Sequence, residues 1–215
     1  MADSSLDPVP FQYASREQRR DADRLGFWIF LATELLLFGS LFTSFAAYAA
    51  LYPTVFREAS LHLNLTLGAL NTGVLLLSSL TMALAVRSLR VGDRRALTWL
   101  LASTAGLGVL FLGLKFAEYF EHYQQHLAPG FGFAYPGPQP EHAEMFFVLY
   151  FVMTGVHAFH LTIGVILVAT MLVLILRGKF SPEHYMPLDL VGLYWHFVDV
   201  IWVFLYPTLY LIGRH

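Results

Sequence analysis

Two ionisable side chains lie in the middle of an apolar stretch near the C-terminus. His196 and Asp199 fall within the segment GLYWHFVDVIWVFLYPTLY, which runs from Gly192 to Tyr210. Residues three positions apart share one face of a helix. A chargeable group inside a bilayer is costly unless it has a partner, so such residues are functional candidates by default. We therefore take this pair as the first candidate site.

Three more ionisable side chains are predicted at the same depth in other apolar segments. A rise of about 1.5 Å per residue puts all five groups in the inner half of a bilayer, roughly 9 to 17 Å from its cytoplasmic side. We name the five together the polar band: Glu34, His157, His160, His196 and Asp199. Lys115 and Glu118 are instead predicted near the outer end of their helix, where the Lys115 side chain can extend to the headgroups.

The polar band allows three interpretations. It is a structural network of carboxylates and imidazoles that satisfy one another, a proton path or lipid-linked site, or a site for a first-row metal. The HxxH spacing of His157 and His160 is weak evidence for a metal, and HEXXH is absent. No residue pair resembles a nucleophile and its base. We favour the structural network and expect neither a catalytic residue nor a bound metal in this chain.

The composition is that of a membrane protein with little mass outside the bilayer. Of 215 residues, 57% are hydrophobic and 13% charged, with a mean hydropathy of +0.58. Soluble domains average roughly 45–50% apolar and 25% charged residues. The net charge of −2 offers no basic field for nucleic acid, and the lack of Cys excludes disulfides, thiolate metal sites and Cys nucleophiles.

Five long apolar segments predict an all-α integral membrane protein with five transmembrane helices. Each segment is long enough to cross roughly 30 Å of hydrocarbon. They lie at about 25–51, 66–89, 96–120, 145–176 and 187–212. Residues 1–24 are expected to form a cytoplasmic tail and residues 25–215 a single five-helix transmembrane domain. No internal repeat is evident, which disfavours a stand-alone proton-coupled transporter.

The distribution of Lys and Arg predicts the orientation. The opposite side of the membrane holds two, Arg57 and Arg214, and the side of the tail holds ten. The ten are Arg16, Arg19, Arg20, Arg24, Arg87, Arg90, Arg94, Arg95, Arg177 and Lys179. Because basic loops stay in the cytoplasm, the N-terminus is predicted inside and the C-terminus outside.

Several sequence blocks, in order along the chain, resemble subunit III of the haem-copper oxidases. The blocks are LATELLLF around Glu34, NTGVLLLSS at 71–79, GDRR at 92–95, EYFE at 118–121, FVMTGVHAFHLTIG at 151–164 and YWHFVDVIWVFLYPTLY at 194–210. The similarity covers about residues 25–213 and is closest to the short, five-span form of cytochrome c oxidase subunit III. Glu34 corresponds to the carbodiimide-reactive carboxylate of that family. Ala158 departs from the Gly usual between the two histidines.

The resemblance implies a non-catalytic subunit of a proton-pumping oxidase that reduces oxygen to water. Haem and copper are expected in the partner subunits and none in this chain. The partners implied are the catalytic subunit I, subunit II and phospholipid, and the role is assembly, lipid binding and sustained proton uptake by subunit I. The location implied is the bacterial cytoplasmic membrane, in preference to the mitochondrial inner membrane.

The family arrangement further implies two helix bundles, formed by spans 1–2 and spans 3–5, with a lipid cleft between them. The side chains expected to meet the lipid are Arg24, Trp28, Arg87 and Trp195. Cytochrome c is the favoured electron donor. The alternatives are subunit III of a quinol oxidase, the accessory protein of a nitric oxide reductase and, from another class, the proton-coupled transporter.

Overall fold

The computed structural model describes residues 16–130, 132–178 and 186–214. Its elements are α1 (Arg16–Leu51), α2 (Pro53–Ser60), α3 (Leu65–Val91), α4 (Arg94–Gln124), α5 (Pro140–Leu176), α6 (Met186–Tyr206) and a π-helical segment, η2 (Pro207–Leu211). The chain divides into two compact units, Met1–Gly39 and Ser40–His215. The first unit thus holds most of α1, and the second holds the end of α1 and every later element.

The five predicted spans are confirmed as helices long and apolar enough to cross a membrane. They are Asp21–Leu51, Leu65–Val91, Arg94–Gln124, Pro140–Leu176 and Pro187–Leu211. The fifth continues from α6 into η2. Residues 16–24 of the predicted tail belong to α1, whereas residues 1–15 lie outside the described part of the chain.

Helices α3 and α4 form a tight hairpin whose ends are set by local sequence. Asn64 begins α3 by accepting a hydrogen bond from the Leu67 N–H at 3.1 Å. Gly92, with φ of 84°, ends α3 in the left-handed conformation that glycine adopts without a steric penalty. The Asp93 carboxylate then accepts from the Ala96 N–H at 3.0 Å and begins α4.

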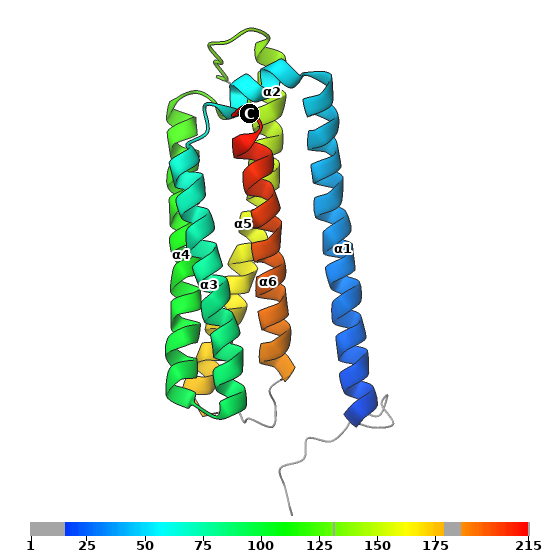
Figure 1. The fold of residues 1–215 in the computed structure, drawn as a ribbon, viewed down its shortest axis with the longest axis vertical. Helices are drawn as coiled ribbons and strands as arrows, with labels where there is room; N and C mark the ends of the chain where they lie inside the picture. Colours follow the sequence, from blue (N-terminus) through cyan, green and yellow to red (C-terminus); the bar gives the residue numbers. More distant parts are fainter. Residues whose placement is uncertain (1–15, 131, 179–185, 215) are drawn as a thin grey trace, which may run out of the picture. The chain divides into compact units, whose positions relative to one another are not determined.

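Helices α3, α4, α5 and α6 pack as an antiparallel four-helix bundle (Figure 1). Each helix contacts the next in sequence, and α6 also contacts α3. The sequence-based division had separated α3 from the three later spans. The contacts of α3 with α4 and α6 correct that division, because they place α3 inside the same bundle.

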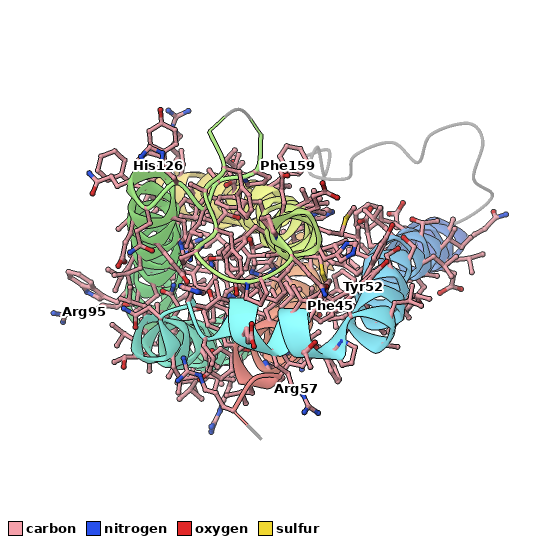
Figure 2. The ribbon with its side chains drawn as sticks, turned by 90° about the horizontal axis from the view of Figure 1, so that it is seen from above. Phe45, Tyr52, Arg57, Arg95, His126 and Phe159 are labelled. Atoms are coloured by element: carbon pink, nitrogen blue, oxygen red, sulfur yellow. The ribbon has the colours of Figure 1, made fainter. Side chains whose placement is uncertain are left out.

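The loop predicted between the first two spans contains a short helix, α2. Pro53 stands at the start of α2, where its missing N–H costs nothing. The helix buries Val55, Phe56, Ala59 and Ser60 on one face. It lies across one end of the bundle, with Arg57 pointing away from the other helices (Figure 2). We call this end of the bundle the α2 end and the opposite end, at Gly92, the turn end.

Aromatic side chains fix α2 to the bundle. The Phe56 ring meets the rings of Phe45 in α1 and Phe146 in α5, each with a centroid separation of 5.4 Å. Tyr52 stacks on His142 with centroids 3.9 Å apart. The α2 end is therefore closed by an apolar contact that joins three helices of the second unit.

Candidate functional site

Two tryptophans of α6 form hydrogen bonds with hydroxyl groups of α3. The Trp195 indole N–H donates to Ser78 Oγ at 3.1 Å, and the Trp202 N–H donates to Thr72 Oγ1 at 3.0 Å. These bonds give a physical reason for the position of α3 in the bundle, because a buried indole N–H needs an acceptor.

Trp195 lies in the bundle interior rather than at the lipid. Its side chain is fully buried, and its ring occupies the space left by two glycines. An added Cβ would come within 2.8 Å of that ring at Gly108 and within 3.1 Å at Gly164. The predicted role of Trp195 in lipid binding is therefore wrong: sequence composition cannot distinguish an interfacial tryptophan from a core tryptophan.

A buried ion pair connects α4, α5 and η2. Lys115 Nζ donates to Glu118 Oε2 at 2.9 Å, to Tyr150 Oη at 3.0 Å and to Tyr210 Oη at 2.9 Å. The Tyr210 hydroxyl in turn donates to Glu118 Oε1 at 2.7 Å. We name these four residues the lysine cluster. Because an ammonium has three donors, the lysine side chain is fully satisfied within the protein.

Aromatic rings enclose the Lys115 ammonium on several sides. Its Nζ lies 4.9 to 5.6 Å from the ring centroids of Tyr119, Tyr150, Trp202 and Tyr210, within cation–π range. Lys115 is 3% exposed and Glu118 is fully buried. The prediction that the Lys115 side chain extends to the headgroups is therefore wrong, because its charge is neutralised and hydrogen-bonded inside the bundle.

Two local features bring Tyr210 to the ion pair. Pro207 opens the π-helical segment η2, and Leu209 and Tyr210 are both buried in it. On the facing helix, Gly68 leaves room for the ring: an added Cβ would lie 3.0 Å from Tyr210 and 2.8 Å from Tyr206. The network thus depends on a widened helical turn and on a glycine in another helix, and neither was recognisable as part of a site from sequence.

Two histidines of the polar band form hydrogen bonds within the second unit. His196 Nδ1 lies 2.8 Å from Ser79 Oγ, which links α6 to α3. His160 Nδ1 donates to the Val156 carbonyl at 2.8 Å, since a carbonyl oxygen can only accept. Glu34 lies in the Met1–Gly39 unit, so its place beside the rest of the band stays a prediction.

Other buried polar groups have no hydrogen-bond partner among the described residues. They are both polar atoms of the Asn71 amide, both ring nitrogens of His157, both carboxylate oxygens of Asp199, and Nε2 of His122. We name these four residues the unpartnered set. The predicted pairing of Asp199 with a histidine is thus not formed by a direct hydrogen bond in the structure. Asn71 and His122 were not predicted as site residues.

Leaving the polar atoms of the unpartnered set without hydrogen bonds would carry a large free-energy cost. An unsatisfied buried polar atom costs about 1–3 kcal/mol, and a whole domain is stable by about 5–15 kcal/mol. Seven such atoms in one bundle would therefore cost as much as the net stability of a domain. A bound ligand, or a structural adjustment, must satisfy at least part of them.

The remaining predicted site residues are at exposed positions. Trp28 is 59% exposed, and Arg24 and Arg87 are exposed. Their predicted contact with lipid stays a prediction. Among the described residues, no group of three His, Asp or Glu side chains is arranged to hold a metal ion.

Comparison with known proteins assigns the chain to a family. The family model for cytochrome c oxidase subunit III matches residues 11–214. The chain is similar to proteins named "Probable quinol oxidase subunit 3", with 30% identity in Staphylococcus epidermidis and 29% in Staphylococcus aureus, over 205 residues and 93% of both chains in each case. The chain therefore belongs to the subunit III family of the haem-copper terminal oxidases.

Proposed function

We propose that the chain is subunit III of a quinol-oxidising haem-copper terminal oxidase in a bacterial cytoplasmic membrane. The similar staphylococcal proteins carry the name of a quinol oxidase subunit and match over 93% of their length. The sequence alone favoured cytochrome c as the donor, so quinol replaces it as the better-supported choice. Oxygen reduction and proton pumping belong to the complex, with haem and copper in the partner subunits.

Within that complex we assign the chain a structural role beside subunits I and II. The observation that carries this assignment is the lysine cluster. Its two opposite charges and two phenol groups hold α4, α5 and η2 together, and each of the four residues is buried. Because Lys115 and Glu118 bind each other and the two phenol groups, their charges stabilise the packing of the helices. That packing in turn supports the surface that the subunit presents to its partners.

The proposed orientation puts the turn end of the bundle in the cytoplasm. Arg90, Arg94 and Arg95 lie there, and Arg95 points away from the other helices (Figure 2). The α2 end carries Arg57 and Arg214 and would face outward. Loops rich in Lys and Arg tend to remain in the cytoplasm, and this tendency supports the proposed orientation. Phospholipid bound near Arg87 and, separately, near Arg24 and Trp28 of the first unit is part of the same proposal.

The choice of electron donor is tested on the native complex. An affinity tag at the C-terminus of this chain would purify the oxidase with its partner subunits. Oxygen consumption is then measured with a quinol and, separately, with reduced soluble cytochrome c. We expect turnover with the quinol alone. Turnover with cytochrome c alone would overturn the donor assignment and leave the family assignment intact.

The structural role is tested by comparing the complex with and without this subunit. We expect nearly the same initial rate of oxygen reduction in both, followed by faster loss of activity during turnover when the subunit is missing. The comparison requires equal haem content in the two preparations. An initial rate that falls immediately on removal of the chain would contradict a purely structural role.

A further inference from the structure

We propose that the four-helix bundle contains ordered water bound at Asn71, His157 and Asp199. The ligand is water because the three side chains are between 0% and 4% exposed, which leaves no access for a lipid headgroup or a larger solute. Buried polar groups in proteins are nearly always satisfied by protein atoms or by ordered water. The proposal does not depend on which electron donor the oxidase uses.

None of the described residues forms a hydrogen bond with the ring nitrogens of His157. The imidazole packs between Phe111 and Trp202, with ring centroids 5.6 Å and 5.1 Å away. The Trp202 N–H is already used by Thr72. The three donors of Lys115, the nearby cation over the same Trp202 ring, are all used within the lysine cluster. A neutral imidazole has one donor and one acceptor, and water can serve both.

The same elimination applies to Asn71 and Asp199. Thr72, next to Asn71, donates its hydroxyl proton to the Gly68 carbonyl at 2.8 Å and accepts from Trp202. Asp199 lies between Trp195 and Trp202 on the buried face of α6, and the indole N–H groups of both donate to α3. Ser79, whose hydroxyl also lies near the Asp199 carboxyl, has its Oγ 2.8 Å from His196 Nδ1. The two indole N–H groups and the Thr72 hydroxyl are therefore committed to other bonds, and water remains the partner that fits Asn71 and Asp199.

The proposed water sites lie well inside the span. Asp199 is eleven residues before Tyr210 in α6 and η2, and His157 is seven residues after Tyr150 in α5. At about 1.5 Å per residue, these positions are roughly 16 Å and 10 Å from the lysine cluster along the bundle axis. The water is therefore internal to the protein and separate from the aqueous phase at the α2 end.

Substitutions distinguish a hydrated site from a dry one by the sign of their effect. Asn71→Leu keeps the shape of the side chain but removes the amide. If water satisfies the amide, the temperature at which this subunit leaves the purified complex falls by about 2–4 °C or more. If the site is dry, the same substitution removes an unsatisfied group and the temperature stays constant or rises, which overturns the proposal at that position.

At His157, a matched pair of variants makes the same comparison. Gln and Met have similar size and flexibility, but only Gln can bind water. Hydration predicts that the His157→Gln complex is more stable than the His157→Met complex, and a dry site predicts the reverse. Thr170→Val is the control, because the exposed Thr170 hydroxyl donates to the Ile166 carbonyl of its own helix.

A direct measurement keeps the proposal falsifiable if a variant fails to assemble. A high-resolution cryo-EM map of the wild-type complex would be inspected around the three side chains. We expect water density at about 2.7–3.2 Å from the amide, imidazole and carboxyl atoms. Density for a metal ion at these side chains would overturn the proposal. It would also be overturned if all three side chains were clearly resolved and none of them had a bound water.

Discussion

The lysine cluster and the unpartnered set occupy the same bundle but satisfy their polar atoms differently. In the lysine cluster, protein groups from α4, α5 and η2 meet every hydrogen of the Lys115 ammonium. In the unpartnered set, no hydrogen bond from the described residues reaches the imidazole of His157 or the carboxylate of Asp199. One region thus holds opposite charges in direct contact, whereas the other holds polar groups that need water.

The difference teaches which buried polar residues stabilise the subunit by contact. Breaking a buried ion pair leaves an uncompensated charge in a low-dielectric interior. Substituting a residue that binds water instead removes one contact with the water, and the neighbouring protein groups keep their own hydrogen-bond partners. We therefore expect substitutions in the lysine cluster to have much larger effects than substitutions in the unpartnered set.

The largest expected effect follows from removing one charge of the lysine cluster. Lys115→Met leaves the Glu118 carboxylate buried without its cation and should destabilise the subunit by about 3–5 kcal/mol. The measurement is the amount of subunit retained in the purified complex on heating. The control is Arg95→Met, which removes a positive charge at an exposed position at the turn end. An arginine is used because Lys179, the other lysine of the chain, lies outside the described residues. Equal retention of the two variants would contradict the importance of the ion pair.

The next effect comes from the phenol group that joins η2 to the ion pair. Tyr210→Phe removes a donor to Glu118 and an acceptor for Lys115. A hydrogen bond to a charged group contributes about 1.5–3 kcal/mol. Because Lys115 and Glu118 keep their bond to each other, we expect a net loss of stability in this range, measured as a lower release temperature. Tyr123→Phe is the matched control, since Tyr123 is 69% exposed. A Tyr210 variant as stable as this control would mean that η2 is held by packing alone.

A smaller effect is expected from the glycine that makes room for Tyr210. Gly68→Ala places a Cβ within 3.0 Å of the Tyr206 and Tyr210 rings, and the resulting overpacking should cost about 1–3 kcal/mol. Gly73→Ala in the same helix meets nothing within 4 Å. It should be neutral or stabilising by up to about 1 kcal/mol through helix propensity. Thermal release of the subunit compares the two, and equal destabilisation would contradict this packing account.

The sequence predicted the helices of this protein better than it predicted its site. Hydropathy located five spans, and the intramembrane polar residues marked candidates. Depth along a helix follows from residue number, but rotation about its axis does not. In a soluble helix the apolar face reveals that rotation, whereas in a membrane helix the lipid-facing side is as apolar as the core. Lys115 was therefore assigned to the wrong surroundings, although it was predicted at the same end of its helix as Glu118.

The buried face of α4 illustrates why rotation could not be predicted. Its buried residues follow one stripe and include both apolar and polar types: Leu97, Leu101, Thr104, Gly108, Phe111, Lys115, Glu118 and His122. The opposite face exposes large apolar side chains such as Phe116 and Phe120. Helix α2 and the π-helical segment η2 escaped prediction for another reason. Helix α2 begins at Pro53, just after the predicted end of the first span, and Pro207 lies inside a span that was predicted as one regular helix.

The smallest effect is expected at Asp199, where the sequence had suggested a paired charge. Asp199→Asn keeps the shape and can still bind water, and no direct ionic partner is stranded by the change. The stability of the subunit, measured by its release temperature, should therefore change by about 1 kcal/mol or less. The initial rate of oxygen reduction should also be unchanged. A loss as large as that of Glu118→Gln would indicate that Asp199 has a charged partner in the complex.

The central claim is that direct pairing exists in the lysine cluster and is absent between His157 and Asp199. Two double-mutant cycles measure it, using the release temperature of the subunit from the complex. Lys115→Met combined with Glu118→Gln should cost less than the sum of the single variants by about 2–3 kcal/mol. His157→Phe combined with Asp199→Asn should be additive within about 0.5 kcal/mol. Additivity in the first cycle, or strong coupling in the second, would contradict the account.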